Sequence, residues 1–259
     1  MTFPCCQTTR FSCAARRVLS ASEDQSDERV YARLSSEWDS ADPRLRDELV
    51  GFFENPVRGA SPLILEMYWD LGSTNTYFAL KLIEPILDKT GAELLLHPFN
   101  LGYVFRAHNY ALMDEPRAKL SNRRRDLWRW AQRYDLPFRM PDVFPIKTSR
   151  ALRGAIAMRR WGLEKPFIEA MFTAYWENND ANVATYPGLR LIAEELEVHP
   201  DEFEEASESM EVRQELIDST NTGMERGVFG APSMLVGDEL FWGKDRMEFV
   251  EAVLLGNSP

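Results

Sequence analysis

Ser73 places a hydroxyl at a point where a strand is expected to give way to a helix. Residues 63–69 are rich in β-forming apolar side chains, and after Asp70 the apolar residues take up helical spacing as far as Leu87. Ser73 is therefore predicted at or near the N-cap, beside unpaired backbone N–H groups and the positive end of the helix dipole. That environment favours an anion, and a thiolate held there would accept a hydrogen bond from the serine. Taken alone, the same serine would also serve as an ordinary helix cap.

A second stretch, residues 226–246, combines a proline, a hairpin and a charged cluster. Ala231-Pro232 precedes a short apolar strand at 233–236, Gly237-Asp238 forms a tight turn, and 240–242 is the returning strand. A proline directly before a strand indicates a strand edge or a cis peptide bond, and a cis bond leaves nearby backbone groups free to pair with an extended ligand. Charged residues begin the last amphipathic helix close by: Lys244, Asp245 and Arg246.

The cysteines restrict the chemistry. The chain has three, Cys5, Cys6 and Cys13, and none beyond them. The folded body therefore cannot contain a disulfide, a thiolate zinc site or a Cys-x-x-Cys pair, and disulfide exchange by protein thiols is excluded there. No metal site is predicted.

Composition sets the broad class. With 259 residues, 44% of them hydrophobic and 27% charged, the chain is long enough for one large globular domain or two small ones. Its net charge of −11 argues against nucleic acid as the main partner. No apolar run approaches the ~20 residues that a membrane span requires. We therefore expect neither a nucleic-acid partner nor a membrane one.

The N-terminal 60 residues differ from the rest. Residues 1–22 contain arginine, serine and threonine but no acidic side chain, a composition that suits a disordered tail or an organellar transit peptide. We predict a cytoplasmic protein, with an organelle as the alternative if 1–22 directs transport. Residues 23–60 show two amphipathic patterns and are predicted to form a helical extension that covers one face of the domain. An arm for dimerisation or for partner binding is the alternative.

Both motifs resemble the 2-hydroxychromene-2-carboxylate isomerase family, a sister of the kappa-class glutathione transferases and a relative of DsbA-type thioredoxin folds. The family run is close to G-V-F-G-V-P-T-F-x-V-x-G-E-x-F-W-G-x-D-R, and residues 227–246 depart from it conservatively. Around the first motif, Thr74 replaces the family's proline, while four positions match: Asp70, Ser73, Tyr77 and Ala79. The resemblance covers residues 63–255.

The resemblance implies an α/β fold: a thioredoxin-like domain with a large all-helical insertion, preceded here by the N-terminal helical extension. The thioredoxin-like parts would be 63–105 and 227–255, with the insertion at about 106–226. It also implies a glutathione-dependent isomerase, in which the glutathione thiolate adds to a conjugated carbon of an aromatic hydroxy-acid, a bond rotates and the thiol leaves. A kappa-like glutathione transferase and a non-catalytic ligand-binding member are the alternatives, and a homodimer is left open.

The same resemblance assigns site residues. Ser73 would be catalytic and would hold the glutathione sulfur, while the backbone of Ala231, beside Pro232, would pair with the tripeptide. Candidate contacts for the rest of glutathione are Asn109, Lys119, Lys244, Asp245 and Arg246. Arg125, Arg129 and Arg133 share one helix face and could meet ligand carboxylates, although such runs are commonly a solvated face. His108, which replaces a family glycine, is left without a role.

Overall fold

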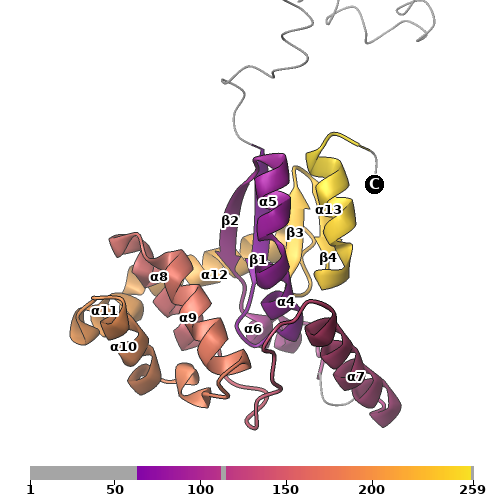
Figure 1. Ribbon diagram of the computed structural model, residues 1–259. Coiled ribbons are helices and arrows are strands. Elements are labelled where there is room, and N and C mark those ends of the chain that lie inside the picture. Colours follow the sequence, from indigo (N-terminus) through magenta and orange to yellow (C-terminus); the bar gives the residue numbers. More distant parts are fainter. Residues whose placement is uncertain (1–62, 112–114, 258–259) are drawn as a thin grey trace, which may run out of the picture. The chain divides into compact units, whose positions relative to one another are not determined.

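The computed structural model describes residues 63–111 and 115–257 (Figure 1). The predictions for residues 1–22 and 23–60 lie outside these residues. In chain order the elements are β1 (Ile64–Trp69), α4 (Thr74–Leu82), α5 (Glu84–Thr90), β2 (Glu93–Pro98), α6 (Leu101–Ala107), α7 (Arg117–Arg133), α8 (Ser149–Met158), η2 (Arg159–Trp161), α9 (Glu164–Trp176), η3 (Ala181–Ala184), α10 (Tyr186–Glu195), α11 (Pro200–Glu208), α12 (Met210–Glu225), β3 (Ser233–Val236), β4 (Glu239–Trp242), η4 (Lys244–Arg246) and α13 (Met247–Leu254).

A four-stranded mixed sheet lies at the centre, in the order β2-β1-β3-β4. The first two strands are parallel, whereas β3 is antiparallel to both of its neighbours, β1 and β4. Strand β1 is central because its apolar side chains can be covered on one face while Tyr68 is covered on the other. Its end therefore lies between β2 and the start of β3, where Tyr68 is opposite Ser233.

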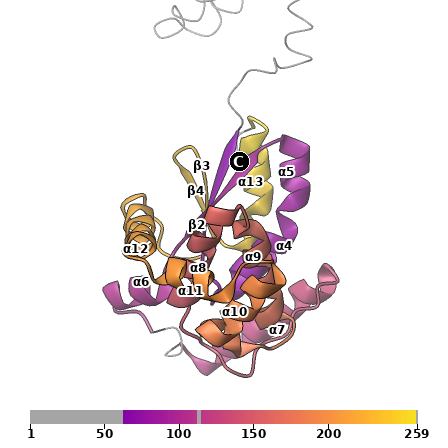
Figure 2. The ribbon, with the colours of Figure 1, turned by 90° about the vertical axis from the view of Figure 1, so that its left-hand side faces the viewer.

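Helices cover both faces of this sheet. Figure 2 shows α12 on one side of the strands and α4, α5 and α13 on the other. On the α13 side, buried apolar side chains of the strands pack with those of α5 and α13, including Met67, Met234 and Val250. On the α12 side, Tyr68 and Phe99 form a smaller buried cluster. Both faces of the sheet are thus covered, and the β1–α4 turn, the start of α6 and the loop before β3 meet beyond the end of β1 at Trp69.

The helices between α6 and β3 form the insertion. Helices α8 to α11 pack around a large aromatic and aliphatic core, in which the Phe167 and Phe203 rings lie 5.2 Å apart. Helix α7 projects from the rest of this unit in Figure 1, and of its residues only Leu127 and Ala131 are buried. None of the helices in the described ranges is both long and apolar enough to cross a membrane.

The observed elements confirm the predicted fold class, a thioredoxin-like α/β domain with a helical insertion. The hairpin forms around Gly237-Asp238, with β4 beginning one residue earlier than predicted. The apolar strand predicted at 233–236 is β3, with the same ends. The turn residues and the apolar pattern therefore located the hairpin well.

Close packing of α12 on the sheet gives a first prediction. A Cβ at Gly223 would lie 2.8 Å from Tyr68 and 2.9 Å from Phe99, both of which are buried aromatic rings. We expect Gly223→Ala to lower the free energy of unfolding by about 1–2 kcal/mol, because overpacking outweighs the helix propensity of alanine. Gly102→Ala is the matched control, since its Cβ would meet nothing closer than 3.4 Å. Equal stability of the two variants in denaturant unfolding would contradict this account.

Candidate functional site

Ser73 caps helix α4 at the end of the β1–α4 turn. Its Oγ accepts a hydrogen bond from the Thr76 N–H at 3.1 Å, and its backbone is extended, as expected of an N-cap. The described residues provide no acceptor for the backbone N–H groups of Thr74 and Asn75. The helix therefore begins with two free donors beside the serine hydroxyl, an arrangement suited to an anion.

The loop before β3 lies against this helix start. The Ala231-Pro232 peptide bond is cis, which settles the alternative that the sequence left open. Ser73 Oγ donates a hydrogen bond of 2.6 Å to the Ala231 carbonyl oxygen. No acceptor within the described residues pairs with the Ala231 N–H. The cis-proline loop thus presents one free donor next to the donors of α4, although the two loops are far apart in the sequence.

A cavity of about 640 Å³ opens over these two loops. One part of its lining is apolar, formed by side chains from α6, α7, the segment before α8, the loop before β3 and strand β4: Leu101, Phe105, Leu127, Met140, Phe144, Phe229 and Trp242. Phe229 and Trp242 lie with their ring centroids 5.2 Å apart. The cavity is large enough for a small aromatic molecule beside a short peptide-like ligand.

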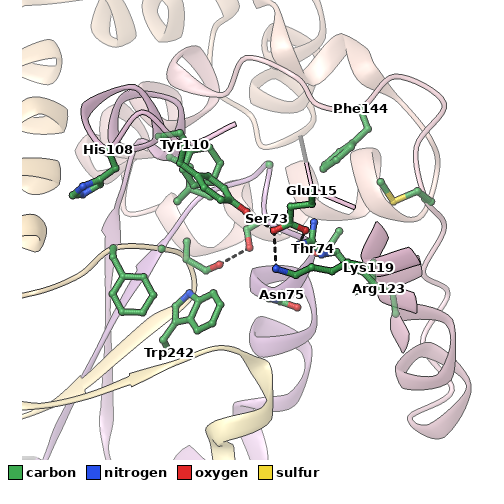
Figure 3. A pocket seen from close by; sticks show the side chains of 18 residues that line it. Ser73, Thr74, Asn75, His108, Tyr110, Glu115, Lys119, Arg123, Phe144 and Trp242 are labelled. Carbon is green, nitrogen blue, oxygen red and sulfur yellow. Dashed lines mark hydrogen bonds and ion pairs between the residues drawn. The ribbon is translucent and has the colours of Figure 1, made fainter. Parts of the chain in front are cut away.

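Another part of the lining is charged. Glu115 accepts a hydrogen bond of 2.6 Å from the Tyr110 hydroxyl, and its carboxylate also pairs with Lys119, at 3.1 Å, and with Arg123. Figure 3 shows the Lys119 side chain reaching toward Glu115. These donors lower the pKa of Glu115, the Tyr110 hydrogen bond most of all. The carboxylate is therefore ionised at neutral pH and is surrounded by two cations.

Asp70 is a buried carboxyl group that connects three of the segments around the cavity. Its carboxyl is 1% exposed and accepts hydrogen bonds from the Gly72 N–H at 2.7 Å, the Leu101 N–H at 2.9 Å and the Thr148 hydroxyl at 3.0 Å. Burial raises the pKa of Asp70 to about 6, because desolvation of the charge outweighs the three hydrogen bonds. One side chain thus ties together the β1–α4 turn, the start of α6 and the segment before α8.

Three of the predicted site residues line the cavity: Ser73, Lys119 and Ala231. The others do not belong to its lining: Asn109, Pro232, Lys244, Asp245 and Arg246. Asn109 is exposed, with a left-handed backbone at φ 51°, and Asp245 pairs with its neighbour Arg246 at 2.7 Å. Their assignment as glutathione contacts stays a prediction that the geometry does not test.

Lys244 occupies an unexpected place. It is 7% exposed, and its ammonium lies 4.6 Å from the Trp130 ring centroid and 3.6 Å from a carboxylate oxygen of Asp126 on α7. Burial lowers the pKa of Lys244, and the nearby carboxylates only partly oppose this effect. The lysine thus contacts α7 from the end of the hairpin and does not line the cavity.

Several lining residues were not predicted from the sequence. Tyr110 and Glu115 carried no recognised motif, and Arg123 is not among the arginines singled out on α7. The three arginines singled out there, Arg125, Arg129 and Arg133, are exposed and lie outside the lining. A signal did exist, because Glu115 and Lys119 have the i,i+4 spacing of an ion pair. His108 lines the cavity, but Figure 3 shows its ring pointing away from Ser73.

Metal binding has no support in this part of the chain. Residues 63–111 and 115–257 contain no group of three or more His, Cys, Asp or Glu side chains that could hold a metal ion.

The fold and the serine-capped helix facing a cis-proline define a class of protein. Residues 64–255 match the DSBA-like thioredoxin domain, and the chain belongs to that family. The relation to DsbA-type thioredoxin folds that the sequence indicated is therefore confirmed.

Within the family, particular relatives are similar to this chain. A 2-hydroxychromene-2-carboxylate isomerase from Sphingobium xenophagum is 28% identical over 197 residues, covering 74% of this chain and 97% of that protein. A solved structure of a 2-hydroxychromene-2-carboxylate isomerase has a TM-score of 0.63 at 26% identity, covering 74% of this chain and 95% of that chain. The cytosolic disulfide reductase DsbM from Pseudomonas aeruginosa, solved with GSH, has a TM-score of 0.53 at 20% identity and full coverage of that chain, which shows the fold alone.

The buried Asp70 carboxyl gives a prediction on pH dependence. Its pKa is raised in the folded protein, so the neutral form is favoured by folding, and this contribution is complete below about pH 4 and is lost as the pH rises through about 6. Wild type should therefore lose up to about 3 kcal/mol of unfolding free energy relative to Asp70→Asn between pH 4 and pH 7. Parallel stability–pH curves for the two proteins, measured in urea, would show that Asp70 does not titrate in this range.

Proposed function

We propose that this chain is a glutathione-dependent isomerase of the 2-hydroxychromene-2-carboxylate isomerase type, acting on a conjugated aromatic hydroxy-acid. One observation carries the proposal: the hydroxyl of Ser73, at the start of α4, faces the cis-proline loop inside a large cavity. No cysteine follows Cys13 in the sequence, so the body of the protein brings no thiol of its own to this position. The position therefore suits a thiol that arrives with a ligand.

The free backbone donors fit such a ligand. The N–H groups of Thr74 and Asn75, together with the dipole of α4, favour a negatively charged sulfur near Ser73. The Ala231 N–H, which has no acceptor among the described residues, can pair with a peptide carbonyl of an extended tripeptide. Glutathione satisfies both requirements, because it combines a thiol with peptide groups.

Bound glutathione would supply a thiolate that adds reversibly to a conjugated carbon, which permits rotation about the neighbouring bond before the thiol is released. Ser73 would donate a hydrogen bond to that sulfur. Its hydroxyl hydrogen points to the Ala231 carbonyl oxygen in the structure, and rotation about the Cβ–Oγ bond would turn it toward the cavity. The Oγ can keep its bond from the Thr76 N–H throughout, so the oxygen itself need not move.

The apolar part of the cavity would receive the aromatic ring of the substrate. Phe229 and Trp242 provide adjacent ring faces, and Gly230 allows this arrangement, since a Cβ there would lie 2.6 Å from the Trp242 indole nitrogen. Phe105 and Phe144 enclose the cavity from other segments. Aromatic side chains of this kind hold a flat ring while excluding water from the reacting carbon.

A kappa-like glutathione transferase would use the same thiolate and the same cavity. The two activities differ in the product, because a transferase leaves the sulfur bonded to the substrate and an isomerase releases it. Mass analysis of the product after incubation with glutathione and a conjugated hydroxy-acid separates them: an isomer of unchanged mass supports the isomerase, and a glutathione adduct supports the transferase.

Ser73→Ala tests the thiolate role directly. We expect glutathione bound to wild type to have a thiol pKa well below the ordinary value of about 8.5, and we expect this pKa to rise by about one unit in Ser73→Ala. At neutral pH this rise lowers the thiolate fraction up to roughly tenfold, and turnover falls with it. The measurement is the ultraviolet absorbance of the thiolate against pH, with S-methylglutathione as the blank.

Ser121→Ala on the exposed side of α7 is the matched control and should behave as wild type. Because Ser73 also caps α4, its replacement costs about 1 kcal/mol of stability, which thermal unfolding must register separately. Identical thiol titrations in wild type and Ser73→Ala would remove the proposed role of the serine. Absence of glutathione binding to wild type would leave a ligand-binding member of the family without this chemistry.

A further inference from the structure

The charged wall of the cavity contains a carboxylate in an unusual position. Glu115, whose side chain is only 10% exposed, pairs with cations that are more open to solvent: Lys119 is 63% exposed and Arg123 is 35% exposed. Glu115 lines the cavity, and the cationic side chains of Lys119 and Arg123 reach it from α7.

The hydrogen-bonding capacity of Glu115 is largely used. Three groups donate to its two oxygens: the Tyr110 hydroxyl, the Lys119 ammonium and the Arg123 guanidinium. A carboxylate held in this manner has little capacity left for a ligand ammonium, so Glu115 is poorly suited to be a ligand contact itself. Glu115 instead accepts the hydrogen bonds of these three donors, as the carboxylate of a bound ligand would.

The charges on this wall do not cancel. Lys119 and Arg123 carry two positive charges and Glu115 carries one negative charge, which leaves an excess of one positive charge at the cavity. Both cations are accessible enough to exchange one carboxylate for another, because neither is buried by the pairing. A ligand carboxylate entering the cavity therefore competes with Glu115 for the same two side chains.

We infer that Glu115 is an internal competitor that sets the affinity of the cavity for ligand carboxylates. Lys119, Arg123 and Tyr110 form the carboxylate site, and the side chain of Glu115 fills it when no ligand is present. The inference rests on the proposed function for the choice of ligands, since the carboxylate could be that of an aromatic acid or the glycine carboxylate of glutathione. It assigns Glu115 as a specificity-determining residue that lowers the affinity for acids and leaves that for neutral ligands unchanged.

Calorimetric titration with two matched ligand pairs tests this assignment. One pair is 2-naphthoate and the neutral 2-naphthamide, and the other is glutathione and its glycine monoethyl ester. We expect Glu115→Gln to bind the acid of at least one pair roughly three- to tenfold more tightly, with the affinity for the matching amide or glycine ester unchanged. Arg123→Gln should weaken the same acid by a similar factor, because the site then loses its guanidinium.

Two control variants account for the change in net charge. Glu169→Gln on α9 and Arg125→Gln on α7 alter exposed residues outside the cavity and should leave all four affinities as in wild type. Circular dichroism establishes that each variant is folded.

The pair that responds identifies the source of the carboxylate. If naphthoate responds and glutathione does not bind at all, the inference stands and the proposed function fails. Weaker or unchanged binding of both acids to Glu115→Gln overturns the inference, as does the failure of both acids to bind any of the proteins.

Discussion

The geometry of the cavity depends on one buried carboxyl group, that of Asp70. It accepts hydrogen bonds from the Gly72 and Leu101 backbone and from the Thr148 side chain, and so joins three segments that no secondary structure connects. The neighbouring Leu71 carbonyl accepts a further bond of 2.8 Å from the Trp176 indole on α9. Burying this carboxyl carries a desolvation cost, which appears as its raised pKa. The helical insertion is held to the thioredoxin-like part at the point where the site is built.

That junction explains why a serine hydroxyl can be placed accurately at a surface cavity. Ser73 lies three residues after Asp70, and its hydroxyl is hydrogen-bonded on two sides, to the Thr76 N–H and to the Ala231 carbonyl. Both are backbone groups, one at a helix start and one beside a cis-proline, so side-chain rearrangement does not displace them. A hydroxyl at this place cannot carry out the chemistry of a protein thiol, and no cysteine follows Cys13 in the sequence.

Helix α7 contributes charged side chains to the cavity, although few of its own residues are buried. It buries only Leu127 and Ala131, and the ammonium of Lys244 lies beneath its Trp130. Yet it supplies Lys119, Arg123 and Leu127 to the cavity. The free backbone donors of the site thus lie at the start of α4 and in the loop before β3, whereas its two cationic side chains lie on a helix with little buried surface.

The sequence by itself determined the local features: the strand before Asp70, the cap at Ser73, the proline hairpin and the apolar helices, because turn chemistry and periodicity act over a few residues. It also excluded a thiol in the body of the chain. Only the tertiary structure decided the cis peptide at Pro232 and the pairing of Ser73 with Ala231, 158 residues apart in the sequence. It likewise directed Lys244 inward and brought Glu115, not Arg125, to the cavity. These outcomes depend on packing between distant segments, which neither spacing nor propensity encodes.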